Sequence, residues 1–404
     1  MDLGFEGNFT VHSSSLSSWE LEKYQLVEDS NVFVKLDALP FETIFACDVN
    51  AKAKASWDEF FSKRRDINET YHMQSIVDIV KNIKSGEMPI PKNIDVVTGG
   101  FPCNDFSVAG KRLGFNSNKS HAGNSKILDG QDDPTVENRG MLYFWMREFI
   151  SLVEPYVFYA ENVKGLVSLG DAKEVISRDF ESINGSGYFV LPVRVLKAIE
   201  YGVPQTRERV IFIGLNKSKM KQEVLEYIEK HQALPPELDF YPKASHGPGG
   251  LWTEDLRQYS TTGDVFSGLV EPEISQDPSQ RAYSRAKYLL KGQGSSEILL
   301  DKPGPTIRAE HHGNIEFRRR SQANGGKNLI ELSAGLEQRR LSVRECSRLQ
   351  TFPDDFEFVI DGKLSASDGY RLIGNAVPPL LAYRLGQRLE SVWDKVFIAR
   401  DKSD

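Results

Sequence analysis

Hydrophobic and polar positions between residues 41 and 215 form an alternation of strand-length and helix-length segments. Short apolar runs that end in polar residues are typical of strands, and apolar residues three or four positions apart are typical of helices. The expected strands cover residues 41–49, 93–101, 155–163, 188–196 and 205–215, and the expected helices cover residues 50–64, 141–153 and 172–183. Strands that alternate with helices predict an α/β protein with a parallel or mostly parallel sheet.

This alternation stops near residue 216. Residues 216–340 are irregular and contain turn-rich stretches such as PPELDFYPKASHGPGG and DKPGPT. Regular structure returns at 341–352, and 369–397 predicts a loop followed by a long amphipathic helix. The expected division is a first domain over 1–215, completed by 366–404, and a smaller second domain with its hinge over 216–365.

Composition narrows the class of protein. The chain has 404 residues, 40% of them hydrophobic and 26% charged, which is ordinary for a globular protein of two domains. No apolar run reaches the roughly 18 residues of a membrane span, and the first twenty residues lack a signal-peptide pattern. We therefore expect a cytoplasmic protein without a membrane partner. Three distant cysteines, Cys47, Cys103 and Cys346, predict neither a disulfide framework nor a zinc site, and we expect no metal.

Charge is unevenly distributed along the chain. Residues 280–350 hold 14 Lys and Arg against 7 Asp and Glu, a local net charge of +7, so the rest carries −14 within the overall −7. Such asymmetry is typical of a protein with one surface that faces an anion such as nucleic acid. A solvated basic face without a partner is the alternative.

The stretch GGFPCNDFS (99–107) follows one expected strand and begins a polar loop over 104–138. Gly99 and Gly100 let the backbone approach a ligand closely, and Cys103 follows at the end of the strand where α/β sheets bind ligands. Cys103 is therefore a candidate nucleophile. The alternative is a small buried hydrophobic residue.

Three further strand ends carry polar residues. Glu161 and Asn162 end the strand 155–163, close to Cys103 if neighbouring strand ends converge, although Glu161 could instead cap a helix. Gln205, Arg207 and Arg209 share one face of a strand, where two arginines are costly without an anion or polar ligand. Asp48 lies at the end of the expected strand 41–49, where an acid commonly holds the ribose hydroxyls of a nucleotide. These residues and others fall into eight short segments along the chain. The segments are DLGFE (2–6), ACDVNAKA (46–53), GGFPCNDFS (99–107), ENRGMLYF (137–144), AENVKGL (160–166), YGVPQTRERVIFIG (201–214), RRLSVRECSRLQTFPDDF (339–356) and GYRLIGNAVPP (369–379).

In this order the segments resemble the motifs of the DNA (cytosine-5)-methyltransferase family. The resemblance covers most of the chain outside 216–300, and the sequence of PC-x-x-FS, ENV, Q-x-R-x-R and GNAVPP is highly specific. It implies a Rossmann-like sheet of the S-adenosylmethionine-dependent methyltransferases, plus a smaller irregular target-recognition domain. The implied reaction is methyl transfer to C5 of cytosine in a specific double-stranded DNA sequence, as the modification enzyme of a prokaryotic restriction–modification system.

By this resemblance Cys103 attacks C6 of cytosine and so turns C5 into a nucleophile. Glu161 contacts N3 and the exocyclic amine, and Arg209 is placed for the O2 edge. Arg207 is similar to the arginine that holds the site and a nearby backbone phosphate. Asn162 orients the site rather than taking part in the chemistry.

The implied methyl donor is S-adenosylmethionine. Asp48 would bind its ribose and Val49 its adenine. Ser75 and Ile76 are the best placement for the third motif, which is poorly matched. The remaining residues implied at this site are Phe5, Gly100, Pro102, Leu142, Asn375, Ala376 and Val377.

A duplex hides C5 and C6, so the target base must be flipped out of the stack. The loop 104–138 would close over it, and Ser107 is placed to touch the DNA backbone. In the recognition domain, the candidates for phosphate or guanine contacts are Arg308, Arg318, Arg319 and Arg320. We expect a monomer that associates with the nucleoid through DNA, with a cognate restriction endonuclease in the same system but no stable contact to it.

The chain departs from the family pattern at residues 1–9, MDLGFEGNF. The family's first motif has a strand and a glycine-rich turn before DLGFE, and the loss of that strand would leave two neighbouring strands without ladder partners. Three readings stay open: a start assigned to an internal Met, a missing piece supplied by another chain, or an inactive product. The alternative functions are a catalytically impaired DNA-binding homologue and, less favoured by the large domain after QTRER, an RNA-directed enzyme.

Overall fold

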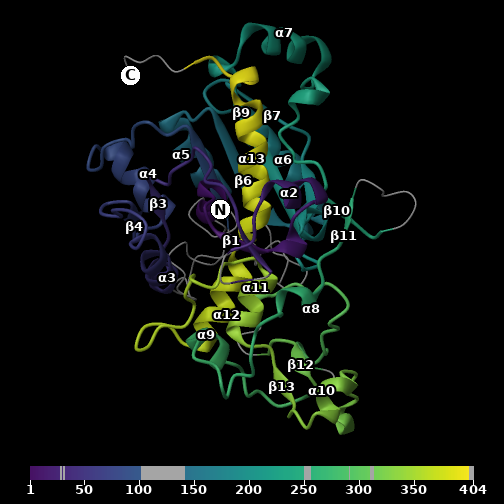
Figure 1. The fold of residues 1–404 in the computed structure, drawn as a ribbon. Coiled ribbons are helices and arrows are strands. Elements are labelled where there is room, and N and C mark those ends of the chain that lie inside the picture. Colours follow the sequence, from purple (N-terminus) through teal and green to yellow (C-terminus); the bar gives the residue numbers. More distant parts are fainter. Residues whose placement is uncertain are drawn as a thin grey trace.

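The computed structural model describes residues 1–27, 30, 32–101, 142–249, 256–290, 292–309 and 314–399. Its largest sheet has the strand order β5-β6-β9-β7, and β8 also pairs with β9. The strands are β5 (Val96–Gly100), β6 (Val157–Val163), β7 (Tyr188–Val190), β8 (Arg194–Lys197) and β9 (Glu208–Asn216). Helices lie on both faces of this sheet (Figure 1), so the expected α/β class is confirmed.

The expectation of a mostly parallel sheet is wrong for this largest sheet. Among its described strands, only β5 and β6 pair in parallel, whereas β9 is antiparallel to β6, β7 and β8. Parallel neighbours need a crossover of a dozen or more residues. The connection from β8 to β9 contains only a short 3₁₀ turn, Ala198–Tyr201, so the chain reverses direction there.

Alternate residues of the central strands face two separate cores. On one face, Val157 and Tyr159 of β6 pack with residues of α1 (Asp2–Glu6) and α13 (Pro379–Val396). On the other face, Phe158 and Ala160 pack with α4 (Ile76–Ser85), α5 (Leu142–Val153) and α6 (Ala172–Glu181). This alternation is what a strand buried on both sides requires.

Helix α1 lies directly against α13. A Cβ on Gly4 would come within 2.4 Å of the Ala382 Cβ, so only glycine permits this approach. The Phe5 ring lies 5.3 Å from the Tyr159 ring, centroid to centroid, and is buried in the core. The first and last segments of the chain therefore form one layer on the sheet.

A second, two-stranded parallel sheet joins β3 (Ala46–Cys47) and β4 (Tyr71–His72), with α3 (Ala51–Phe61) between them in sequence. Among the described strands, β3 pairs only with β4 and β5 pairs only with β6. The remaining small sheets are β1 (Thr10–His12) with β2 (Phe33–Lys35), β10 (His246–Gly247) with β11 (Arg257–Gln258), and β12 (Phe317–Arg319) with β13 (Arg339–Arg340).

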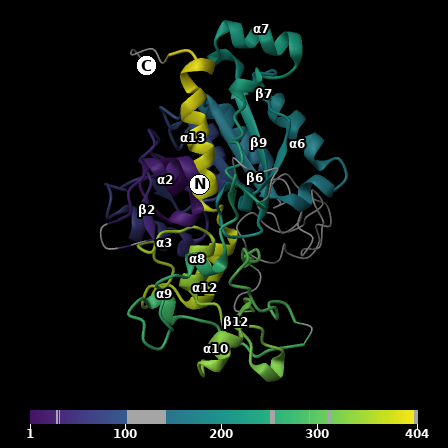
Figure 2. The same ribbon diagram turned by 45° about the vertical axis from the view of Figure 1, so that its right-hand side comes forward.

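The elements from α8 (Thr262–Val265) to α12 (Ala366–Asn375) form the part of the molecule that lies below the sheet in Figure 1 and in the rotated view of Figure 2, whereas α7 (Gln222–His231) lies at the top and α13 runs beside the sheet. Residues 369–375, expected as a loop, are helical and end α12, because Ser365 caps that helix and Asp368 completes a capping box. The other helices are α2 (Ser18–Lys23), α7 (Gln222–His231), α8 (Thr262–Val265), α9 (Pro278–Arg281), α10 (Leu329–Ser333), α11 (Val343–Leu349) and α12 (Ala366–Asn375).

Residues 216–247 contact the sheet unit. The Tyr241 hydroxyl donates to the Ile211 carbonyl at 2.7 Å, and the Arg388 Nε of α13 donates to the Asp239 carbonyl at 2.6 Å. These contacts attach the start of the expected second domain to the first, and the division at residue 216 stays a prediction. Within the described ranges, no helix combines the length and apolarity needed to cross a membrane.

Candidate functional site

The ends of three strands meet where the sequence places the catalytic residues. Gly100 of β5 pairs with Glu161 of β6, and Val163 of β6 pairs with Arg209 of β9. The Asn162 Nδ2 donates to the Phe101 carbonyl at 3.1 Å. Phe101 is the last described residue before the PC stretch, so this bond fixes the point from which that stretch departs. Cys103, Pro102 and Ser107 lie outside the described residues.

Glu161 and Arg209 form an ion pair at this edge of the sheet. The Arg209 Nε lies 2.5 Å from the Glu161 Oε1, and each side chain is only 12% exposed. Arg209 Nη1 also donates to the Glu208 carbonyl at 2.8 Å. A Cβ on Gly100 would lie 3.1 Å from Glu161 Oε2, so the missing side chain leaves room for that oxygen. The two predicted residues are thus brought together and held in one orientation.

Arg207 does not reach this opening. Its side chain is fully buried, and its guanidinium donates to the carbonyls of Ile307, Gly374 and Ala376 at 2.9–3.0 Å. A contact with a backbone phosphate is therefore unavailable to Arg207 in this arrangement. Its physical task is to join β9 to two later segments of the chain.

Gln205 and Gln350 add further hydrogen bonds between the segment that leads into β9 and these later segments of the chain. Gln205 Nε2 donates to Gln350 Oε1 at 2.7 Å, and Gln350 Nε2 donates to the Ala376 carbonyl at 2.7 Å. Gly374 permits the close packing, since a Cβ there would lie 2.3 Å from the Ala309 nitrogen. Sequence reasoning did not select Gln350 because a buried side-chain amide leaves no periodic signal.

The residues expected at the methyl-donor site divide into exposed and buried groups. Asp48 follows β3 and is exposed, and Val49 beside it is 44% exposed. Met73, which the sequence analysis missed, follows the paired strand β4 and is 41% exposed. An accessible carboxylate and two accessible apolar side chains at the ends of parallel neighbours suit a ribose and an adenine. These residues fit S-adenosylmethionine.

Other residues of that group have structural tasks. The Ser75 hydroxyl caps α4 by accepting from the Val77 N–H at 3.2 Å, and Ile76 begins that helix. Phe5 is buried in the core described above, and Leu142 is buried at the start of α5. The closing motif offers Asn375, which is exposed, then Ala376, which is partly exposed, and Val377, which is buried.

The arginines expected to contact DNA also differ from one another. Arg318 and Arg319 are buried, and both pair with Glu331, while Arg319 also pairs with Glu271. Neither could contact a phosphate without breaking these ion pairs. Part of the excess of positive charge in residues 280–350 is therefore neutralised by carboxylates of the protein itself.

Arg308 and Arg320 remain accessible, to different degrees. Arg308 is exposed and follows Ile307, whose carbonyl Arg207 holds. Arg320 is partly buried, and its Nη2 donates to the Gly325 carbonyl at 2.8 Å. Arg308 thus lies next to a residue that Arg207, directly before β9, holds by a hydrogen bond.

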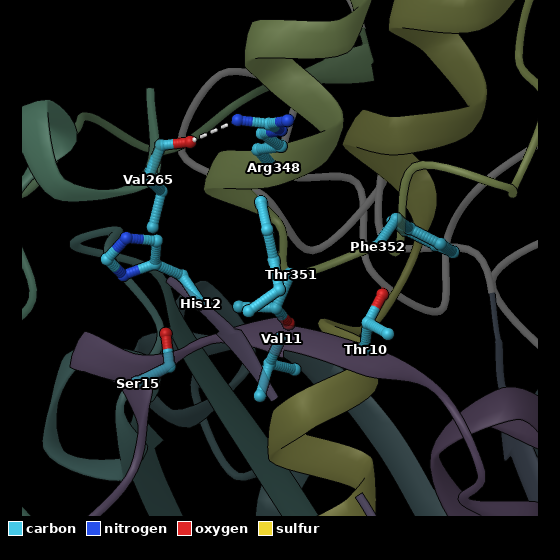
Figure 3. Close-up of a pocket in the computed structure, with 9 residues that line it drawn as sticks. Thr10, Val11, His12, Ser15, Val265, Arg348, Thr351 and Phe352 are labelled. Atoms are coloured by element: carbon cyan, nitrogen blue, oxygen red, sulfur yellow. Dashed lines mark hydrogen bonds between the residues drawn. The ribbon is translucent and has the colours of Figure 1, made fainter. Parts of the chain in front are cut away.

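A small, partly open cavity lies between β1 and the end of α11 (Figure 3). Its volume is about 10 Å³, which is enough for about one water. His12 and Thr351 line it, and the Arg348 Nη1 donates to the Val265 carbonyl at 3.0 Å beside it. The cavity is too small for a nucleotide-type ligand. In the described part of the chain, no three His, Cys, Asp or Glu side chains are grouped to hold a metal.

Comparison with known proteins identifies the class of protein that this fold and site define. Residues 34–391 match the family model for C-5 cytosine-specific DNA methylases. Type II methyltransferase M.NgoFVII of Neisseria gonorrhoeae is 31% identical over 313 residues, which cover 74% of this chain and 70% of that protein. Type II methyltransferase M.FnuDI of Fusobacterium nucleatum is 29% identical over 348 residues, which cover 83% of this chain and 89% of that protein.

A solved structure shows the same fold. The S. pombe Dnmt2 methyltransferase superposes with a TM-score of 0.52 at 16% identity, covering 87% of this chain and 92% of that one. The chain belongs to the C-5 cytosine-specific DNA methylase family. It is a DNA cytosine methyltransferase, and the methyl donor of this family is S-adenosylmethionine.

Proposed function

We propose that this chain methylates one cytosine within one short double-stranded DNA sequence, as the modification enzyme of a restriction–modification system. The names of its relatives M.NgoFVII and M.FnuDI, both type II methyltransferases, support the biological role. The observation that carries the chemistry is the Glu161–Arg209 ion pair at the joined ends of β6 and β9, next to the segment that leads to Cys103.

In the proposed reaction the Cys103 thiolate adds to C6 of a flipped cytosine and forms a carbon–sulfur bond. The electron pair of the C5–C6 double bond then makes C5 nucleophilic. Glu161, oriented by Arg209, contacts N3 and the exocyclic amine and offsets the charge that develops on the ring. Removal of the C5 proton restores the double bond and releases the thiolate.

S-adenosylmethionine, when bound, supplies the methyl group. Asp48 would hold its ribose hydroxyls, and Val49 and Met73 would contact its adenine. Asn162 fixes the Phe101 carbonyl two residues before Cys103, which limits how the nucleophile can move.

DNA binding is assigned first to Arg308. Its exposed side chain follows Ile307, whose carbonyl Arg207 holds, so a phosphate contact there would be made from an anchored segment of the chain. Arg318 and Arg319 support the recognition domain from inside through their ion pairs. We expect the enzyme to act as a monomer, without stable contact to a cognate endonuclease.

The proposal is tested by expressing the chain in a methylation-free host and sequencing its plasmid after bisulfite conversion. The expected result is protection of one cytosine in every copy of one short motif. A Cys103→Ser variant should show no protection. Specific DNA binding without protected cytosines would instead establish a binding homologue and reject the enzyme.

A further inference from the structure

The second domain contains a hollow of about 470 Å³ that the proposed reaction does not use. It opens between residues 288–290 and 292–297 on one side and the turn that follows β12 on the other. Residues that line it include Tyr288, Leu290, Arg320 and Lys327. It is far larger than the cavity of Figure 3, which has room for about one water.

A buried carboxylate holds one wall of the hollow. The Glu297 side chain is 1% exposed and accepts main-chain N–H bonds from Arg320 at 3.0 Å and from Lys327 at 2.5 Å. The Asn328 N–H adds a third bond at 3.4 Å. A buried charge is costly unless it is paired and hydrogen-bonded. Here these bonds fix the irregular turn 320–328 in one shape.

A buried guanidinium fixes chain segments next to the residues that line the hollow. Arg340 donates to the carbonyls of Ala286 at 2.8 Å, Lys287 at 3.1 Å and Gly294 at 2.7 Å, and also to that of Ile315. The arginine thus adds side-chain hydrogen bonds to segments that, among the described residues, belong to no named strand. The hollow is therefore a preorganised surface rather than a gap between loose loops.

The side chains at the mouth of the hollow combine cationic donors with apolar groups. Lys327 is exposed, and within the described residues its ammonium has no carboxylate at ion-pair distance. The Arg320 guanidinium lies 5.7 Å from the Tyr288 ring centroid. Leu290 is 81% exposed, and Ile330 on the neighbouring α10 is 86% exposed. The Lys327 ammonium and the Leu290 side chain are therefore both accessible to a partner at the hollow.

We propose that this hollow reads base-pair edges of the target DNA, with Lys327 as a specificity-determining residue. The inference rests on the proposed function and deepens it. Lysine and arginine donors match O6 and N7 of guanine, and an exposed leucine matches the methyl group of thymine. The buried Glu297 carboxylate should not repel DNA, because its negative charge is balanced by the main-chain N–H donors described above and by the Arg320 guanidinium.

The test compares wild type with Lys327→Ala and Leu290→Ala on the methylated motif and on a set of duplexes that each change one base pair. Both side chains are exposed, so both variants should fold. Lys302→Ala is the matched control, since Lys302 is an exposed lysine of the same domain that does not line the hollow. The readout is kcat/KM for each duplex and KM for S-adenosylmethionine.

Lys327→Ala should lower kcat/KM on the motif about 5- to 100-fold and remove discrimination at one base pair only, with KM for S-adenosylmethionine unchanged. Leu290→Ala should relax the preference at a different position. An equal loss on every duplex would assign Lys327 to a phosphate and overturn the inference, as would behaviour identical to Lys302→Ala. If wild type methylates no duplex, the proposed function itself fails.

Discussion

Replacement of Arg207 by Met tests whether that arginine joins the structure or contacts DNA. The change keeps an unbranched side chain of similar length and removes every donor. Of the three carbonyls that Arg207 serves, Ala376 keeps a bond from Gln350, whereas those of Ile307 and Gly374 lose the only side-chain donor described for them. Two buried acceptors at about 1–3 kcal/mol each give a loss of about 2–6 kcal/mol in the free energy of unfolding.

Urea unfolding of wild type and Arg207→Met measures this loss. The control is Arg194→Met, because Arg194 is 49% exposed and forms a surface ion pair with Asp239 that contributes no more than about 1 kcal/mol. A change below 1 kcal/mol for Arg207→Met, with weakened DNA binding, would refute the structural account and restore the phosphate contact that the sequence suggested.

Three further predictions concern other parts of the molecule. Burial lowers the pKa of both His12 and His246 to about 4. As the pH falls below about 6.5, these histidines take up protons in the unfolded chain but not yet in the folded protein. The free energy of unfolding should therefore fall between about pH 6.5 and 4, by roughly 2 kcal/mol per histidine at pH 5. Urea midpoints that do not change with pH over this range would contradict the prediction. Asp48→Ala should weaken S-adenosylmethionine binding at least about tenfold by calorimetry, whereas Ser75→Ala should cost only about 1 kcal/mol of stability; equal loss of affinity would reject this division. Glu161→Gln should lower kcat at least about 100-fold with DNA affinity retained, and a near-normal rate would remove the carboxylate from the mechanism.

The sequence predicted those parts of the fold that depend on local patterns. The helices near 50–64, 141–153 and 172–183 and the strands now named β5, β6 and β9 follow from hydrophobic periodicity and lie where expected. The direction of β9 did not follow, because strand pairing depends on the length and shape of connections that carry no hydrophobic period. The helical state of 369–375 was hidden for a related reason, since its evidence is the capping box at Ser365 and not the glycine-containing stretch itself.

The candidate site was predictable where a residue type and a strand end coincide. Glu161 and Arg209 are adjacent because the carboxyl end of β6 lies beside the amino end of the antiparallel strand β9. Arg207 could not be separated from Arg209 by sequence, as both occupy the same face of one strand, and only the packing of the segments near 307 and 374 buries the first. The pairing of Arg319 with Glu271 spans 48 residues and is equally invisible to local reasoning.

The central claim is that the Cys103 sulfur bonds to C6 of a target cytosine during methyl transfer. The most direct test uses the methylated motif with 5-fluorocytosine at the target position, since fluorine at C5 leaves no proton for the last step and the adduct persists. With S-adenosylmethionine present, wild type should form a covalent complex that survives denaturation, with the DNA mapped to Cys103 by mass spectrometry, and Cys103→Ser should form none. The absence of a complex from wild type, or a complex at another residue, would contradict the account.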